Sequence, residues 1–533
     1  MQRIEIYDTT LRDGTQGVDF NLTSDDKVAI AQRLDAFGVD YIEGGWPGSN
    51  PKDMDFFERM KGVKLSHAQL SAFGATRHKN NDPAEDPNLQ ALLAAETPVV
   101  TIFGKSWTLH VEVSLGATLE QNLAMIESSV AYLKAHDKLV IYDAEHFFDG
   151  YRADPDYALA TLDAAVRGGA DRLVLCDTNG GTLPHDVADL VAEVCGRYDV
   201  PVGIHPHNDA ELAVANALAS VRAGAVHVQG TINGYGERCG NANLTSIIPN
   251  LSLKLGCEQP QDLSKLRELS RYVDERANLQ PNERAAYVSD AAFAHKGGVH
   301  VSAVNKDPRT YEHIDPETVG NRRHILLSEL SGRANVLAKS LEYGEETDSA
   351  DPAVQLVVAR LKELEHRGYA FEGAEGSFQL LCRKVRNEYQ PYFVLHGFNI
   401  NITKRDSDPV PVAEATIKVE VAGEFEHTAA NGHGPVNALD AALRKALVRF
   451  YPSIEELELV DYKVRVLSGP ETGTASVVRV LVETTDGRDT WGTVGASTDI
   501  INASYEAIID AIEYKLLKDR VVSRVSAAPD VVR

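Results

Sequence analysis

Over the first 260 residues, short apolar runs alternate with longer stretches in which apolar residues recur at a helical spacing. Short apolar runs bounded by polar or glycine-containing segments indicate buried strands, and the longer periodic stretches indicate amphipathic helices. The predicted strands are Ile4–Tyr7, Tyr41–Gly45, Leu65–Phe73, Val99–Phe103, Leu139–Asp143, Arg172–Cys176, Val202–His205 and Val226–Gly230.

Helix signals fall between these strands. The stretch Ser24–Phe37 has Ser24 as a candidate N-cap and Gly38 just past its end. The other predicted helices are Leu119–Ala135, Asp156–Arg167, Leu183–Gly196, Glu211–Ala223 and Asn243–Leu255. Eight βα units of about 30 residues match a (β/α)8 barrel, which is typically about 250 residues long. We therefore predict an α/β fold with a closed TIM barrel over residues 1–262; an open doubly wound sheet is the alternative.

The remaining chain changes character twice. Residues 263–388 are predicted to form helical subdomains, with interruptions at 291–300 and 311–316 and an exposed loop at 345–352. From residue 389 to 533 strand-like runs alternate with two Ala-rich helices, which indicates an α+β domain. The two helices have similar glycine-rich entrances, at 432–435 and 495–497, and so suggest a weak internal repeat. These entrances are either carboxylate sites at helix N-termini or simply tight turns.

Composition narrows the class of protein. The formal net charge of −25 argues against nucleic acid and anionic membranes as partners. No stretch of 18 uncharged apolar residues occurs, and the N-terminus lacks an apolar signal core. The five cysteines form no C-x-x-C pair. A cytoplasmic protein fits these observations best.

Two histidines follow the seventh predicted strand. His205 and His207 are two residues apart, so an extended strand points both imidazoles to one face. Two neutral imidazoles on one face can share a divalent cation, and Asp13, which follows the first strand, offers an anionic third ligand. The alternative for the histidine pair is a structural one, in which both rings bond to backbone.

Polar residues gather at the ends of other predicted strands as well. They lie at Arg12–Gln16, Glu43–Pro47, Asp143–His146, Asp177–Gly181 and Asn233–Asn241. In a closed barrel these ends meet at one face, where the active site lies. The glycines at 234, 236 and 240 lack dinucleotide-binding spacing and follow no first strand, which excludes that type of site.

Three of these segments carry a family resemblance. Asp8–Gly14, His205-x-His207 and Asn233–Asn241, in that order, resemble the family of isopropylmalate, homocitrate and citramalate synthases and hydroxymethylglutaryl-CoA lyase. The region after residue 389 is similar to the regulatory domain of the isopropylmalate and citramalate synthases. Within the family, Gly14–Gly17, Tyr142–Gly150 and Cys176–Gly181 most resemble the citramalate branch.

The resemblance implies a metal-dependent acyltransferase. Its members remove a proton from acetyl-CoA, add the resulting enolate to a 2-keto acid and hydrolyse the thioester. The implied metal ligands are Asp13, His205, His207 and Asn241, with Mg²⁺ or Mn²⁺ expected and Zn²⁺ possible in principle. For Asn241 the alternative is a turn residue that bonds its own backbone.

The resemblance also implies roles for other residues. Arg12 would stabilise negative charge on the keto oxygen, and Gln16 and Thr178 would join it in binding the keto acid. Glu145 matches the family's catalytic glutamate. His300 and Tyr311 match a pair that acts on the acetyl-CoA proton or on the hydrolytic water. The sequence His300-Val-Ser departs from the His-Gln-Asp of isopropylmalate synthase.

The expected reaction joins acetyl-CoA and pyruvate to give citramalate in isoleucine biosynthesis. The alternative in the same class is condensation with 2-ketoisovalerate in leucine biosynthesis. A lyase or an inactive barrel that senses amino acids is less compatible with this chain. The resemblance further implies a homodimer and inhibition by isoleucine at the C-terminal domain.

Overall fold

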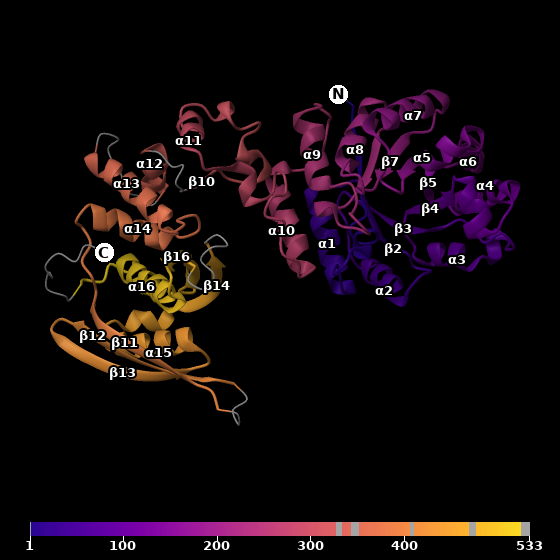
Figure 1. The fold of residues 1–533 in the computed structure, drawn as a ribbon. Coiled ribbons are helices and arrows are strands. Elements are labelled where there is room, and N and C mark those ends of the chain that lie inside the picture. Colours follow the sequence, from indigo (N-terminus) through magenta and orange to yellow (C-terminus); the bar gives the residue numbers. More distant parts are fainter. Residues whose placement is uncertain (1, 327–332, 343–350, 406–409, 468–475, 524–533) are drawn as a thin grey trace. The chain divides into compact units, whose positions relative to one another are not determined.

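The computed structural model describes residues 2–326, 333–342, 351–405, 410–467 and 476–523 (Figure 1). The chain forms two compact units. The first unit consists of Met1–Phe293 and Ile314–Arg323, and the second of Ala294–His313 and His324–Arg533. The first unit therefore continues past residue 262, the predicted end of the barrel.

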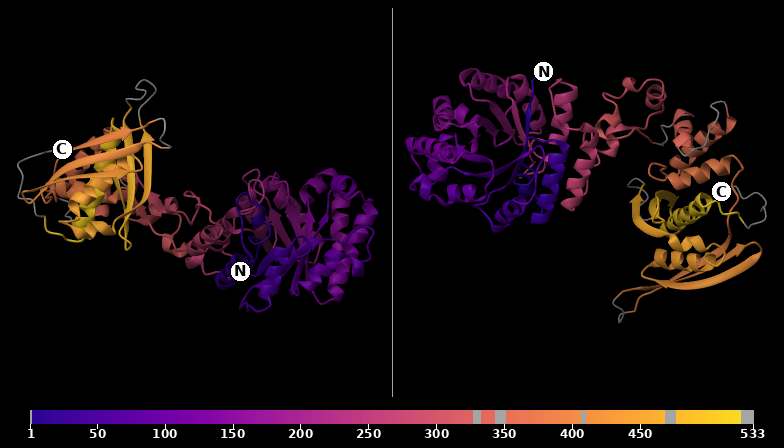
Figure 2. Two further views of the ribbon diagram at one scale, coloured as in Figure 1. Left: turned by 90° about the horizontal axis from the view of Figure 1, so that it is seen from below. Right: turned by 180° about the vertical axis from the view of Figure 1, so that it is seen from behind.

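The first unit contains a closed barrel of eight parallel strands in sequence order (Figure 2). The strands are β1 (Glu5–Asp8), β2 (Tyr41–Gly45), β3 (Gln69–Ala75), β4 (Val99–Lys105), β5 (Leu139–Glu145), β6 (Arg172–Asp177), β7 (Val202–Pro206) and β8 (His227–Gly230). Strand β1 pairs with both β2 and β8, which closes the ring. The TIM barrel prediction is confirmed, and the open sheet is excluded.

Helices surround the strands of this unit. They are α1 (Ser24–Phe37), α2 (Pro51–Met60), α3 (Pro87–Ala94), α4 (Leu119–Ala135), α5 (Phe147–Ala153), α6 (Pro155–Gly168), α7 (Pro184–Arg197), α8 (Ala213–Arg222), α9 (Leu244–Leu253) and α10 (Leu266–Arg276). Helices α1 and α4 have the predicted ends. The N-cap of α1 is Thr23 rather than Ser24, because Thr23 forms a capping box with Asp26.

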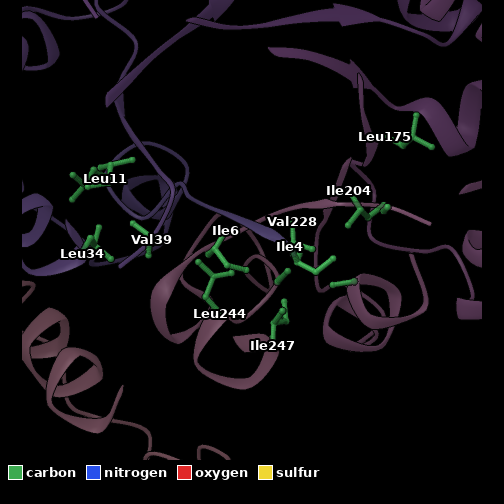
Figure 3. Packing of buried hydrophobic residues seen from close by; sticks show 14 of the residues in the cluster. Ile4, Ile6, Leu11, Leu34, Val39, Leu175, Ile204, Val228, Leu244 and Ile247 are labelled. Carbon is green, nitrogen blue, oxygen red and sulfur yellow. The ribbon is translucent and has the colours of Figure 1, made fainter. Parts of the chain in front are cut away.

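The core of the first unit lies between strands and helices (Figure 3). Figure 3 shows Ile6 of β1 and Val228 of β8 close to Leu244 and Ile247 of α9. A second, smaller cluster fills one end of the barrel interior and includes Tyr7 and Tyr41. Because strand residues alternate between these two sides, β1, β2, β4, β5 and β6 contribute to both clusters.

The second unit begins with helices. They are α11 (Gly298–Val304), α12 (Arg333–Glu342), α13 (Pro352–His366) and α14 (Glu375–Val385), with the short strands β9 (Ala294–His295) and β10 (His324–Ile325). Most of the predicted exposed loop at 345–352 lies outside the described residues. Asp351 at its end caps α13 by accepting a hydrogen bond from the N–H of Ala353.

The C-terminal part consists of two similar halves. Each half is a three-stranded antiparallel sheet followed by a helix that packs on it (Figure 2). The halves contain β11 (Val394–Thr403), β12 (Val412–Val421), β13 (Glu424–Gly432) and α15 (Pro435–Leu447), and β14 (Glu458–Val466), β15 (Val478–Thr485), β16 (Thr490–Ser497) and α16 (Ile500–Lys518). The predicted repeat is confirmed, with three strands in each half.

One predicted helix entrance is wrong. Residues 495–497 belong to β16, and α16 begins only at Ile500. Gly495 is required there because an added Cβ would lie 2.0 Å from the carbonyl oxygen of Ala503. Asp499 already caps α16 by accepting from the N–H groups of Ile501 and Asn502. The N-terminus of α16 is therefore occupied by a side chain of the protein itself.

Two further predictions can be compared with the structure. Within the described residues, no helix is both long and apolar enough to cross a membrane. All five cysteines are free thiols, as expected for a reducing compartment. The compartment itself stays a prediction.

Candidate metal centre and active site

The predicted ligands come from three neighbouring strands. Asp13 lies in the turn after β1, His205 lies in β7, and His207 follows β7 directly. Asn241 follows β8 and forms a β-bridge with His207. Because the barrel closes β8 onto β1, segments more than 190 residues apart in sequence lie side by side.

The side chains of Asp13, His205 and His207 converge. Nε2 of His205 lies 3.2 Å from Oδ2 of Asp13 and 3.3 Å from Nε2 of His207. Nε2 of His207 lies 3.8 Å from the same Asp13 oxygen. Ligand atoms about 2.1 Å from one cation lie about 3.0–3.4 Å apart, depending on octahedral or tetrahedral geometry. These three groups therefore fit a divalent cation.

Asn241 supplies an independent test of that fit. Its amide Nδ2 donates to the carbonyl oxygen of Tyr235, at 3.3 Å. Its Oδ1 is buried and has no hydrogen-bond partner among the described residues. A buried oxygen without a donor is costly unless a cation or a ligand pairs with it. Asn241 therefore fits as a fourth ligand, as the resemblance implied.

The charge around the centre keeps Asp13 ionised. Burial alone would raise the pKa of Asp13, but Arg12 and the two imidazoles outweigh it and hold this pKa well below its usual value. Burial lowers the pKa of His207 to about 4. Burial also opposes the charged form of His205, yet the hydrogen bond and charge of Asp13 raise its pKa. His207 is therefore uncharged near neutral pH, as a metal-binding imidazole must be.

Arg12 is fixed beside this cluster. Its Nε donates to Oε2 of the fully buried Glu43 at 2.6 Å, and its Nη1 lies 3.3 Å from Oδ2 of Asp13. The guanidinium also lies over the ring of Phe73, with Cζ 3.7 Å from the ring centre. For Nη2 no partner is found among the described residues. Arg12 can therefore donate to a ligand in the barrel without losing its anchors.

Glu145 is the last residue of β5, and Thr178 directly follows β6. The carboxylate of Glu145 forms an ion pair with Lys105, its register neighbour at the end of β4. The hydroxyl oxygen of Thr178 accepts from the N–H of His146 at 2.9 Å, so its own O–H remains available to donate. Arg238, in the loop after β8, donates hydrogen bonds to the carbonyl oxygen of Thr178 and to the carboxylate of Asp209, which follows β7.

The structure places the other predicted residues as follows. Gln16 lies in the short 3-10 turn Gly14–Gln16 and is exposed. His300 and Tyr311 are both exposed in the second unit, and their rings stack with centres 4.2 Å apart. The expected pairing of His300 with Tyr311 is thus present. The roles assigned to these residues stay predictions.

Several residues around the centre were not predicted from the sequence to have a role there. Glu43 was noted only as polarity at a strand end, Phe73 only as the last residue of a predicted strand, and Lys105 not at all. Gln229 in β8 accepts a hydrogen bond from Nδ1 of His205 through its Oε1 and is fully buried. A polar residue inside an apolar strand was the available signal for Gln229, since barrel interiors are usually filled by branched apolar side chains.

Three family models match successive parts of the chain. An HMGL-like model matches residues 3–273. A model of the homocitrate synthase post-HMGL domain matches residues 287–369. A model of the LeuA allosteric (dimerisation) domain matches residues 372–516. The barrel and the C-terminal domain therefore correspond to known domains in the predicted order.

Full-length relatives narrow the family. The chain is 54% identical over 524 residues to (R)-citramalate synthase from Geobacter sulfurreducens, covering 98% of this chain and 99% of that protein. It is 54% identical over 523 residues to (R)-citramalate synthase from Aquifex aeolicus, covering 97% and 98%. A 2-isopropylmalate synthase from Methanocaldococcus jannaschii is 32% identical over 525 residues, covering 97% and 95%. The alternative expected from sequence is thus the more distant one, and the chain belongs to the (R)-citramalate synthases of the HMGL-like family.

Proposed function

We propose that this enzyme condenses acetyl-CoA with pyruvate and hydrolyses the thioester, releasing (R)-citramalate and CoA. The observation that carries the proposal is the buried cluster of Asp13, His205 and His207 beside Arg12. A cation held by this cluster would bind a 2-keto acid, and the guanidinium of Arg12 would donate to the same substrate. The identity of 54% to (R)-citramalate synthases supports pyruvate as that keto acid.

Asp13, His205, His207 and Asn241 would hold the cation, with Mg²⁺ or Mn²⁺ preferred and Zn²⁺ as the other option. When bound, the cation would polarise the keto carbonyl as a Lewis acid. Arg12 would donate to the keto oxygen as negative charge grows there. Thr178, and Gln16 if its loop turns inward, would donate to the carboxylate of pyruvate.

Proton transfer is assigned to three residues. His300, with Tyr311, would remove the methyl proton of acetyl-CoA or activate the hydrolytic water. Glu145 would act at the end of β5, where Lys105 now pairs with it. For Glu145 to accept a proton, its contact with Lys105 must loosen. General acid–base groups of this kind typically contribute about 10²–10⁴-fold to the rate.

The residues around Arg12 support a small substrate. The ring of Phe73 stacks on Phe103 with centres 5.4 Å apart, and Trp46 meets both rings edge-on. Phe73 is also the ring beneath Arg12. This aromatic cluster, which includes the ring beneath the guanidinium, would leave room for a methyl group more readily than for an isopropyl group. Such pocket differences are worth about 1–3 kcal/mol per methylene.

A panel of 2-keto acids tests the proposal. We expect rapid release of free thiol from acetyl-CoA with pyruvate and much slower release with 2-ketoisovalerate. EDTA should abolish the activity, and Mg²⁺ or Mn²⁺ should restore it. His205→Ala and His207→Ala should fold normally but lose most metal affinity. Thiol release with 2-ketoisovalerate alone would contradict the proposed substrate, and full activity in either histidine variant would contradict the metal centre.

We further propose that the enzyme is a cytoplasmic homodimer of the isoleucine pathway and that isoleucine inhibits it through residues 389–533. The match to the LeuA allosteric (dimerisation) domain supports both points. The apolar residues around the predicted entrance at 495–497, Val494, Ile500 and Ile501, do not line one pocket for an inhibitor, because Val494 packs in a different apolar cluster from Ile501. Light scattering gives the subunit number. Titration calorimetry with isoleucine and leucine identifies the inhibitor, and no heat from either would contradict the regulatory proposal.

A further inference from the structure

Gln229 lies inside the barrel next to a metal ligand. Its Oε1 lies 2.7 Å from Nδ1 of His205, and its Nε2 donates to Oδ1 of Asp143 at 3.1 Å. Gln229 is fully buried, and Asp143 and His205 are nearly so. The three side chains come from β8, β5 and β7, so the contact crosses the barrel interior. A buried polar chain of this kind is costly unless every member is paired.

The partners fix the orientation of the Gln229 amide. Nε2 of Gln229 donates to Oδ1 of Asp143, so the NH₂ end of the amide faces that carboxyl group. The carbonyl end then faces His205, and a carbonyl oxygen can only accept. Nδ1 of His205 must therefore carry the hydrogen in this contact.

We propose that Gln229, held in place by Asp143, is a positioning residue that directs the free electron pair of His205 Nε2 toward the metal centre. With the hydrogen on Nδ1, neutral His205 presents Nε2 as a ligand. That atom lies 3.2 Å from Asp13 and 3.3 Å from Nε2 of His207. The inference rests on the metal centre of the proposed function and adds how one of its ligands is set.

The two imidazoles differ in whether a protein group hydrogen-bonds to their Nδ1 atom. Nδ1 of His207 is buried and has no partner among the described residues. The orientation of His205 is therefore the better defined of the two. Changes in outer partners of metal-bound histidines typically cost about 10–100-fold in metal affinity, so we expect an effect of that size from loss of Gln229.

Metal binding without substrates tests the inference. Mn²⁺ is titrated into the metal-stripped full-length protein, and the free ion is measured by electron paramagnetic resonance. We expect Gln229→Leu to weaken Mn²⁺ binding about 10–100-fold. The matched control is Gln261→Leu, since Gln261 is also a buried glutamine of the first unit but donates to the carbonyl oxygen of Gly38. The control should bind Mn²⁺ like the parent.

A second pair of variants separates positioning from simple loss of packing. Asp143→Asn keeps an acceptor oxygen for Gln229 and should retain near-parental affinity. Asp143→Leu removes that acceptor, frees the amide to rotate and should weaken binding. Parental affinity in both Gln229→Leu and Asp143→Leu would overturn the inference. If Gln229→Leu fails to fold, equal affinity in the two Asp143 variants would overturn it.

A measurement on the unsubstituted protein needs no variant. Nitrogen-15 spectra of histidine-labelled, Zn²⁺-loaded protein should place the His205 hydrogen on Nδ1, and a hydrogen on Nε2 would overturn the inference. If the parent binds no divalent cation at all, the metal centre itself fails. That result differs from normal parental binding with no effect of the substitutions, which would refute Gln229 alone.

Discussion

At the scale of single residues, Arg12 shows how the barrel prepares one donor group. Glu43 holds Nε, Phe73 supports the flat face of the guanidinium, and Asp13 lies beside Nη1. A lysine ammonium has three rotating donors on one atom and no planar face, so it could not hold these three contacts at once in a fixed geometry. The remaining donor therefore has a fixed direction, which the developing charge on a keto oxygen requires.

We expect Arg12→Lys to lower kcat about 10²–10³-fold, the usual effect of losing a preorganised donor. Mn²⁺ affinity should change much less, because the cation ligands stay in place. Thiol release at saturating Mn²⁺ and pyruvate gives kcat, and Mn²⁺ titration gives the affinity. Parental kcat in this variant would remove Arg12 from the reaction.

The buried Asp8 predicts how the stability of the protein depends on pH. Burial raises the pKa of Asp8 to about 7, although Thr10 donates to its carboxylate. In the unfolded chain the pKa of an aspartate is about 3.9. Between these values the native state holds more protons than the unfolded state, so stability falls as pH rises.

Asp8→Asn should therefore melt at a higher temperature than the parent at pH 8, with a smaller difference at pH 5. The gain at pH 8 should be a few kcal/mol in the free energy of unfolding, since each pKa unit corresponds to about 1.4 kcal/mol. Calorimetric melting at both values of pH measures it. A difference that does not depend on pH would show that ionisation of Asp8 is not the cause.

The three metal-ligand candidates could be predicted from sequence, whereas the residues that contact and orient the site's side chains could not. His205 and His207 have a spacing that fixes a common face, and strand ends of a barrel converge, so Asp13 could be brought to them. Gln229 stands out only as a polar residue in an apolar strand, and its role and that of Lys105 depend on which side chain lies across the barrel or on the next strand.

At the scale of elements, local signals decided which helices could be predicted. Helix α4 begins with a capping box formed by Thr118 and Gln121, and its ends were predicted correctly. Helix α2 also has strong signals, the cap Asn50 followed by Pro51, but these were overlooked. Strand β16 was taken for a helix entrance because its glycines resemble a turn. Their real role is close packing, which only the tertiary structure reveals.

The two halves of the C-terminal domain offer a matched glycine test. Gly495→Ala should destabilise this domain strongly, because the added methyl group would overlap the carbonyl oxygen of Ala503. Gly434→Ala, at the corresponding end of the other half, should be tolerated, because a Cβ there meets nothing within 4 Å. Urea unfolding followed through Trp491, which is buried in this domain, compares the two. Equal stability would refute the packing role of Gly495.

At the scale of the whole molecule, the helical subdomain depends on the C-terminal sheets. Val494 of β16 is part of one apolar cluster with Phe378 and Leu381 of α14. Ser377 of α14 also donates to Asp510 of α16 and accepts from the N–H of Val494. The predicted boundary near residue 388 therefore separates segments that share a core within the second unit.

A chain that ends at residue 389 should consequently expose the α14 cluster. We expect it to aggregate or to bind the dye ANS strongly, since exposed apolar patches of this kind promote association. Light scattering and dye fluorescence against the full-length chain measure this. A monodisperse truncated protein without dye binding would show that residues 294–388 are stable without the sheets.

The positions of the metal ligands have a consequence for how the barrel assembles. Asp13 stands at the first strand and His205, His207 and Asn241 at the last two, so the ligands sit on either side of the seam where the ring is joined. No ligand set exists until the final strands have been made and laid against the first. A cation bound there would link the two sides of the seam, and it would stabilise the closed ring more as its concentration rises above its Kd. Binding of a cation at full affinity would therefore require that β7 and β8 lie against β1.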